Sequence, residues 1–378
     1  MEASTAEQAL AHGRAFVALS RTTYLALTGD RPERLSATWP GEVEVLDRTT
    51  GESRLRAIAR LVLRAGRYEA VVLDGSVGLR KGYVDLFGAA VIGRRRSGPV
   101  VVIADCTWKR GRNWLDRLAC RMGIRLVDSP KVSYCVVSTE EVSIFPRTWG
   151  VDPERVAFVP WPYVLPQDQL EPILVRGRTV FAGGDSLRDY RPLIEAAHGL
   201  DAEVTIATRR RDLVEEDAAP SNVRVGPVSR NEYLELMRRA RVVVVALAPT
   251  VERTAGQTTY TNAMAMGKLI VVTEGIGVRD YVEDGVTGLI VPQGDADALR
   301  RTLAWAVDPA NSDAADRIAA RAREFALERL SPDEYIVNLL RVARRRVEEI
   351  RTPKSAAPSA SDLAGSSLPG RAEPPSSR

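Results

Sequence analysis

Short apolar runs rich in β-branched residues alternate with helix-like stretches along almost the whole chain of 378 residues. The helix-like stretches include residues 53–66, 82–96, 188–200 and 231–240. Strands that are apolar on both faces, each followed by a helix, are typical of a parallel sheet covered on both sides. The pattern therefore predicts an α/β fold. The apolar runs are residues 23–29, 42–47, 69–74, 99–105, 134–139, 155–160, 178–183, 202–208, 223–226, 241–247, 269–273 and 288–292.

A proline-rich passage, VPWPYVLPQDQLEP, interrupts this alternation at residues 159–172. Its four prolines cannot occupy central strands or helix interiors, so the passage is predicted to be a linker between two doubly wound α/β domains. Ligands of such sheets bind outside the carboxyl ends of the strands, and here the two crevices can face one another. We assign the segments as follows: first domain 1–160, linker 161–173, second domain 174–330, C-terminal helix 331–351, and a disordered tail 352–378 rich in Pro, Ser, Ala and Gly.

Composition argues against several classes of protein. No apolar run reaches the length of a membrane span, and the first residues lack the basic and apolar regions of a signal peptide, so a cytoplasmic protein is expected. Cys106, Cys120 and Cys135 form no ligand-spaced pair and are expected to be reduced and buried; no metal site is expected. The chain has no GxxxxGK[ST] motif, and no GxGxxG follows the first strand of either domain. These absences argue against a P-loop ATPase and a nicotinamide dehydrogenase.

Basic residues cluster between positions 94 and 121, although the net charge of the whole chain is only +4. Such a cluster is compatible with an anionic lipid or a phosphorylated acceptor, and hence with peripheral contact at the inner surface of a membrane. A solvated arginine-rich face is the alternative. The cluster lacks the aromatic platform on which nucleic-acid bases stack, so no nucleic-acid partner is expected. Its members are Arg94, Arg95, Arg96, Lys109, Arg110, Arg112, Arg117 and Arg121.

Two strand ends in the second domain have features of an anion site. Gly183 and Gly184 end the run 178–183, and Arg188 follows them just before a helix. Glycines let a ligand approach the backbone, and a guanidinium group fits phosphate; a tight turn would also explain the glycines. Arg209 follows the next strand at the same edge of the sheet, where a solvated arginine is the alternative.

A third such segment, AGQTTYTNAMAMG at residues 255–267, follows the strand run 241–247. Gly256 permits close approach of the backbone, and Gln257, Thr258 and Thr259 are predicted to begin a helix whose free N–H groups attract an anion. The threonine hydroxyls could instead act as ordinary N-caps. Three anion-friendly segments at the strand ends of one domain favour a phosphate-bearing ligand.

Residues 262–299 resemble the carboxyl-domain signature of GT-B glycosyltransferases, especially the retaining group that uses nucleotide sugars (family 4-like, or group 1). The positions that match this signature are Ala263, Met264, Ala265, Gly267, Gly285, Gly288 and Asp295. The resemblance implies two Rossmann-like domains that face a central cleft, with the nucleotide sugar held by the second domain and the acceptor by the first.

Carried over by position, the resemblance implies that Gly184 and Arg188 meet the diphosphate and that residues 256–259 cradle it or the sugar. The family has two glutamates where this chain has Thr254 and Asn262. The amide of Asn262 can still hydrogen-bond ribose hydroxyls as donor and acceptor.

We therefore expect a metal-independent and cofactor-independent glycosyltransferase that moves a sugar from a nucleotide-diphosphate sugar to a small-molecule, glycan or lipid-linked acceptor. Neither His12 nor His198 stands where inverting relatives place a base, so retention is expected, with Arg188 stabilising the leaving diphosphate. Asp105 is the first candidate to orient an acceptor hydroxyl and Asp74 the second, although either could merely cap a helix. A nucleotide-sugar epimerase and a non-catalytic GT-B-like binding or scaffold protein remain as alternatives.

Overall fold

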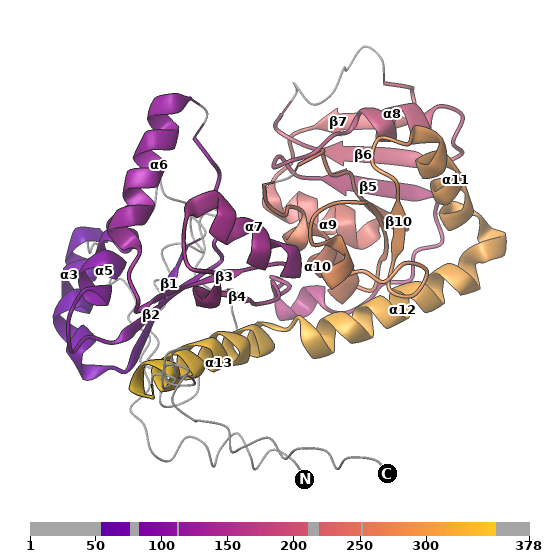
Figure 1. Cartoon of the computed structure of the whole chain (residues 1–378). Coiled ribbons are helices and arrows are strands. Elements are labelled where there is room, and N and C mark those ends of the chain that lie inside the picture. Colours follow the sequence, from indigo (N-terminus) through magenta and orange to yellow (C-terminus); the bar gives the residue numbers. More distant parts are fainter. Residues whose placement is uncertain (1–53, 76–82, 112, 211–218, 251, 353–378) are drawn as a thin grey trace, which may run out of the picture.

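Two parallel β-sheets with their helices form two lobes in the computed structural model of the chain (Figure 1). The structure describes residues 54–75, 83–111, 113–210, 219–250 and 252–352. The predicted α/β class with two Rossmann-like domains is confirmed. The predicted strand runs 23–29 and 42–47, His12, and residues 353–378 of the predicted tail lie outside the described residues.

The first sheet has the strand order β1-β2-β3-β4, and three of its strands lie within predicted apolar runs, whereas β3 begins two residues before the run 134–139. Helices cover one face, where their apolar side chains form a core with alternate strand residues. The strands are β1 (Ala70–Asp74), β2 (Val100–Ala104), β3 (Val132–Val136) and β4 (Val156–Phe158). The helices on this face are α3 (Arg54–Arg64), α5 (Tyr83–Gly93), α6 (Trp114–Val127) and α7 (Thr139–Trp149).

The second sheet has the order β10-β9-β8-β5-β6-β7, so the chain reverses its direction of winding between β5 and β8. Such a switch point opens a crevice at the carboxyl ends of the two strands, which is where ligands bind in open α/β sheets. The strands are β5 (Thr179–Gly183), β6 (Glu203–Ala207), β7 (Val223–Gly226), β8 (Val242–Val245), β9 (Leu269–Thr273) and β10 (Leu289–Val291). The helices are α8 (Arg191–Ala197), α9 (Arg230–Arg239), α10 (Gln257–Ala265), α11 (Ala296–Val307) and α12 (Ser312–Arg329).

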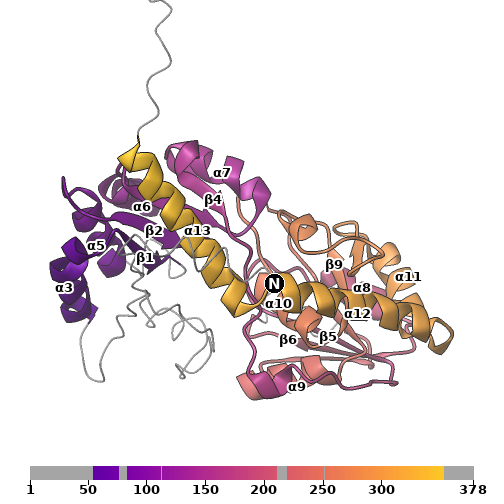
Figure 2. The same ribbon diagram turned by 90° about the horizontal axis from the view of Figure 1, so that it is seen from below.

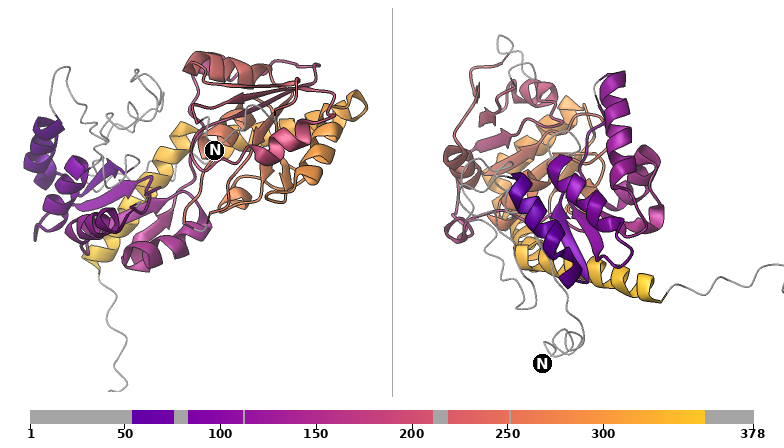
Figure 3. Two further views of the ribbon diagram at one scale, coloured as in Figure 1. Left: turned by 90° about the horizontal axis from the view of Figure 1, so that it is seen from above. Right: turned by 90° about the vertical axis from the view of Figure 1, so that its left-hand side faces the viewer.

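The helix α13 (Pro332–Arg351) leaves the second domain and packs on the other face of the first sheet (Figures 2 and 3). Its buried residues Tyr335, Leu339 and Leu340 belong to the same apolar cluster as Val72 and Val102 of the first sheet. The two crossings of the chain between the domains lie side by side, since the backbone N–H of Tyr163 donates to the carbonyl of Leu330 (2.9 Å). The first sheet is therefore covered on both faces, as the apolar strands predict.

The hydroxyl group of Tyr281 connects the two domains and the linker. It donates to the carbonyl oxygen of Val137, at the end of β3 (2.7 Å), and accepts from the backbone N–H of Trp161 (2.8 Å). Tyr281 is 2% exposed, so both backbone groups depend on this hydroxyl for a partner. One side chain of the second domain thus fixes the carboxyl edge of the first sheet.

The start of α7 makes further contacts with the second domain. The Glu141 carboxylate accepts hydrogen bonds from the backbone N–H and the hydroxyl of Thr254 (3.0 and 3.4 Å). The backbone and hydroxyl of Thr139 donate to the carboxylate of Asp280 (2.8 and 2.7 Å). Glu141 is buried, and this burial raises the pKa of its carboxyl group although the hydrogen bonds it accepts act in the opposite direction.

We expect the substitution Tyr281→Phe to lower the free energy of unfolding by about 1–3 kcal/mol, because it leaves two buried backbone groups without a partner. Tyr260→Phe is the matched control. The rings of Tyr260 and Tyr281 are in contact, but the buried Tyr260 hydroxyl has no hydrogen-bond partner among the described residues, so its removal should be neutral or stabilising. Urea denaturation of both variants checks this; equal losses would show that the Tyr281 hydroxyl has no special role.

We expect Glu141→Gln to change how stability depends on pH. Because its pKa is raised, Glu141 binds its proton more tightly in the folded protein than in the unfolded chain. Its favourable contribution is therefore complete below the ordinary glutamate pKa of about 4 and is lost as the pH rises through the raised folded value. In thermal melts between about pH 4 and pH 8, Glu141→Gln should gain stability relative to the wild type as the pH rises. A difference that stays constant with pH contradicts this expectation. The exposed Glu324, changed to Gln, is the control.

Candidate functional site

A cavity of about 760 Å³ lies between the two domains, at the carboxyl ends of β5, β6 and β8 and opposite the end of β2. Side chains of both domains and of the linker line it. Of the predicted site residues, the cavity brings together Asp105, Gly184, Arg188, Arg209, Gly256, Gln257, Thr258, Thr259 and Asn262. Gly183 does not line it. The structure thus gathers into one place residues that are up to 157 positions apart, from Asp105 to Asn262 (262 − 105).

Arg188 presents a buried positive charge to this cavity. Its guanidinium group donates to the carbonyl oxygens of Gly183 (3.3 Å) and Ser186 (2.9 Å) and to the hydroxyl of Thr259 (3.3 Å). These acceptors are all neutral, and no described carboxylate forms an ion pair with Arg188. At Gly184, whose φ is +118°, an added Cβ would lie 3.0 Å from the guanidinium group, so glycine leaves room for it. A buried cation with neutral partners favours an anionic ligand.

Arg253 is a second arginine of the cavity, and the sequence analysis missed it. It follows β8 and donates to the hydroxyl of Ser186 (2.7 Å) and to the carbonyl of Thr254 (3.1 Å). Burial lowers the pKa of its guanidinium group, while the charges of Glu141 and Asp105 act in the opposite direction. Among the described residues it too has no ion pair. A single arginine in a loop has no local sequence pattern that would identify it. The one sign in the sequence was that Arg253 lies three residues before Gly256.

The first turn of α10 leaves hydrogen-bond donors available. Gly256, with φ +95°, is the N-cap residue and no side chain caps the helix. The backbone N–H groups of Gln257 and Thr258 have no partner among the described residues. Gln257 is 8% exposed, and its buried Nε2 also has no partner. Buried donors are rarely left unsatisfied, so this end of the cavity needs an acceptor from a ligand.

The threonine hydroxyls at this helix start do not act as N-caps, which removes that alternative. Thr258 accepts a hydrogen bond from the indole Nε1 of Trp161 (3.0 Å). Thr259 accepts from Arg188 and is 3.3 Å from the hydroxyl of Tyr233. Both hydroxyls therefore position neighbouring side chains of the cavity.

The two positions that depart from the family glutamates are buried and already engaged. The Oδ1 atom of Asn262 accepts from the backbone N–H of Val164 in the linker (2.6 Å). The Nδ2 group of Asn262 has no partner among the described residues, and the residue lines the cavity. Thr254 is held by Glu141, so the carboxylate beside this loop comes from the first domain.

Asp105 is the acidic side chain that the first domain contributes to the cavity lining. It follows β2, is 7% exposed and has a φ of +51°. Positive φ is uncommon outside glycine, although aspartate tolerates it better than most residues, and such positions concentrate at functional sites. The other candidate, Asp74, ends β1, but its side chain lies outside the described part of the structure.

Gly183 and Arg209 have roles that differ in part from those predicted. A Cβ at Gly183 would lie 2.4 Å from the ring of Tyr233, so this glycine makes room for a tyrosine rather than for a ligand. Arg209 lies at the rim and is paired with Asp185 (3.0 Å). Burial works against ionisation of Asp185, but hydrogen bonds from Arg209 and Thr208 hold its pKa below the ordinary value. Arg209 thus has a carboxylate partner that Arg188 and Arg253 lack.

His198 and the three cysteines do not line the cavity. His198 is exposed at the end of α8. The three cysteines are buried and form no disulfide bond with one another, as predicted. Within the described ranges, no group of three or more His, Cys, Asp or Glu residues is placed to hold a metal ion. None of the helices in those ranges has both the length and the apolar character needed to cross a bilayer.

Comparisons with known proteins agree with this architecture. Residues 175–308 match the family described as Glycosyl transferases group 1. No curated protein sequence matches the chain. Among solved structures, HepE of Anabaena in complex with UDP-glucose is similar at a TM-score of 0.57 and 14% identity, covering 82% of this chain and 85% of HepE.

Sucrose-phosphate synthase of Thermosynechococcus elongatus gives a TM-score of 0.58 at 14% identity, covering 88% of this chain and 98% of the synthase. WaaG, a glycosyltransferase involved in lipopolysaccharide biosynthesis, gives 0.51 at 15% identity, with 90% and 99% covered. The chain thus has the fold of the GT-B glycosyltransferases, and residues 175–308 of its second domain match the group 1 family.

Proposed function

We propose that the protein transfers a sugar, with retention of configuration, from a nucleoside-diphosphate sugar bound at the carboxyl edge of the second sheet to an acceptor held by the first domain. The observation that carries this proposal is the pair Arg188 and Arg253. Both guanidinium groups are in the cavity and have no ion-pair partner among the residues that the structure describes, and they lie next to the uncapped start of α10. Two cations and free N–H groups fit the two phosphates of such a donor.

In this reaction the arginines would stabilise the negative charge that develops on the leaving diphosphate. Asp105 would orient the acceptor hydroxyl from the opposite wall, and the departing phosphate would accept its proton. No histidine lines the described cavity, which supports a route without a histidine base. The proposal assigns no metal and no cofactor to the site, and the acceptor can be a small molecule, a glycan or a lipid-linked sugar.

The related HepE structure contains UDP-glucose, so uridine nucleotides are the first ligands to test. We expect UDP, GDP or dTDP to raise the melting temperature of the protein. The preferred nucleotide sugar should then release its sugar slowly to water, and proton NMR of the released anomer would report retention or inversion. No stabilisation by any of the three nucleotides rejects the donor site, and binding without sugar release favours a non-catalytic protein.

The variant Arg253→Ala tests the cavity directly. Loss of a charge-assisted hydrogen bond should weaken binding of the preferred nucleoside diphosphate by about 10- to 100-fold in calorimetric titration. Arg224→Ala is the control, because Arg224 is exposed on β7 and does not line the cavity. Equal affinities of the two variants would place the diphosphate elsewhere.

The variant Gln257→Ala separates a binding role from a structural one. Its Nε2 has no partner in the described part of the protein, so removing it should leave the melting temperature unchanged or raise it. The same change should weaken nucleotide binding by about 5-fold, the effect of losing one hydrogen bond. A loss of stability with unchanged affinity would show that Gln257 serves the fold alone.

A further inference from the structure

The helix α6 turns a large apolar face to solvent. Its inner residues Cys120, Ile124 and Val127 pack into the core of the first domain. Figure 1 shows the helix standing out from the other helices of that domain. A surface helix ordinarily carries charged and polar residues on its outer face. The outer face of α6 instead carries Trp114 (71% exposed), Leu115 (57%), Leu118 (48%), Met122 (57%) and Leu126 (63%).

These side chains form one continuous stripe with a basic edge. At about 100° per residue, the leucines and Met122 fall within an arc of about 80°, on the side opposite the buried residues. Arg117, Arg121 and Arg125 follow at one residue per turn along one edge of this stripe, and Trp114 lies on the same edge. All three arginines are exposed. We call this surface the α6 outer face.

The apolar stripe and its arginine edge together indicate what kind of partner this surface binds. An exposed apolar stripe is unfavourable in water, so it marks an interaction surface. A helix with leucine and tryptophan on one side and arginines beside them lies in the interface of a bilayer, with its apolar side chains among the acyl chains. The long arginine side chains reach from such a position to the headgroups and favour negative lipids. We propose that the α6 outer face docks the protein onto an anionic lipid bilayer.

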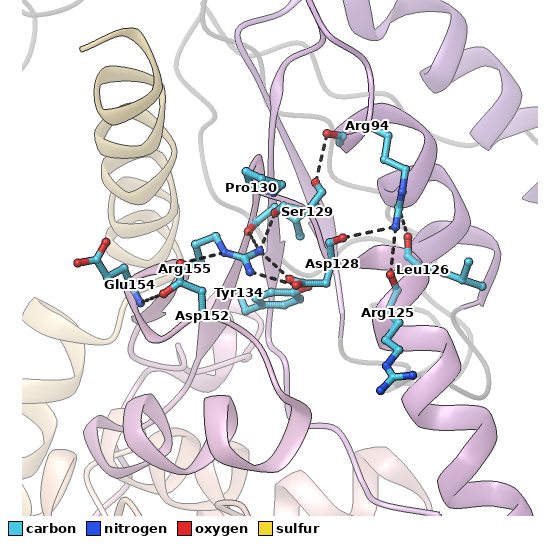
Figure 4. Close-up of polar contacts among 12 residues, drawn as sticks. Arg94, Arg125, Leu126, Asp128, Ser129, Pro130, Tyr134, Asp152, Glu154 and Arg155 are labelled. Carbon is cyan, nitrogen blue, oxygen red and sulfur yellow. Dashed lines mark hydrogen bonds and ion pairs between the residues drawn. The ribbon is translucent and has the colours of Figure 1, made fainter. Parts of the chain in front are cut away.

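Arg94 and Arg95, two members of the basic cluster between residues 94 and 121, have roles in the fold. The guanidinium group of Arg94 donates to the carbonyl oxygens of Arg125 (3.0 Å) and Asp128 (3.4 Å) and to that of Leu126, at the end of α6 (Figure 4). Arg95 donates to the carbonyl of Val62 (2.7 Å). Arg94 therefore supports the end of α6 and Arg95 contacts α3, and we place the lipid contact on α6 itself.

Binding of the α6 outer face to lipid would also affect the cavity, because α6 is close to it in the sequence. The helix directly follows the segment 105–113, and Asp105 and Thr107 of that segment line the cavity. Docking of the α6 outer face would hold this wall of the cavity close to the lipid surface. The membrane contact goes beyond the proposed sugar transfer and does not depend on it.

Co-sedimentation of the full chain with vesicles tests the contact, using phosphatidylcholine alone and phosphatidylcholine with about 30% phosphatidylglycerol, at low and high salt. We expect binding to the anionic vesicles that weakens with salt. The triple change Arg117→Ala, Arg121→Ala, Arg125→Ala should weaken it on the order of 100-fold, at about fivefold per arginine. The double change Leu118→Glu, Met122→Glu should abolish it. Leu174→Glu, at an exposed apolar residue outside α6, is the control and should bind like the wild type.

Four results would overturn the docking site. Wild-type protein that ignores anionic vesicles, or a Leu118→Glu, Met122→Glu variant that still binds, excludes the α6 outer face. A large fall in melting temperature for that variant but not for Leu174→Glu would show that the rest of the chain covers this face. A change from dimer to monomer in light scattering would assign the face to a second copy of the chain. Nucleotide binding is measured in parallel and is expected to be unchanged in all variants. A failure of the proposed donor site would therefore be recognised separately from a failure of lipid binding.

Discussion

The hydroxyl of Tyr281 holds the two domains in the arrangement on which the cavity depends. It connects β3 of the first domain and the start of the linker to the second domain, and all three groups are buried. The close approach continues at Gly277, where an added Cβ would lie 2.5 Å from the side chain of Ser138. Because the cavity wall comes from both domains, the separation between Asp105 and the arginines is set by these contacts and not by either sheet alone.

Charge is distributed unevenly across the cavity, and this explains which residues can act on a ligand. Arg209 is paired with Asp185, whereas Arg188 and Arg253 donate to carbonyl and hydroxyl oxygens. The second domain has Thr254 and Asn262 where the related family has glutamates, so it adds no negative charge at those positions. Glu141 of the first domain reaches Thr254 instead. The carboxylate is thus tied to the domain interface, and the donor side of the cavity stays positive.

The strands could be predicted from the sequence because each is apolar on both faces. Nine of the ten described strands fall within the predicted runs, and β3 begins two residues before the run 134–139. The strand-end rule located Arg188 and Gly256 for the same reason, since parallel strands end at one edge. Arg253, Tyr281 and Glu141 could not be found in this way. Each has a partner far away in the sequence, at a separation of 67 positions for Arg253 and Ser186 and of 113 for Glu141 and Thr254. The outer face of α6 was missed because a sequence pattern does not show whether an apolar residue is exposed or buried. Nor could a local pattern show that Tyr233 packs against Gly183.

The position of α13 has a consequence for how the chain reaches its native state during synthesis. The face of the first sheet that carries Val72 and Val102 is covered by a helix encoded after the entire second domain. A nascent chain emerges from the ribosome amino end first, and its domains ordinarily fold in that order. Here the first sheet keeps an apolar face exposed until about 200 further residues have been made, from the end of β4 at Phe158 to Arg351. This interval is when the protein is most open to aggregation and to capture by chaperones.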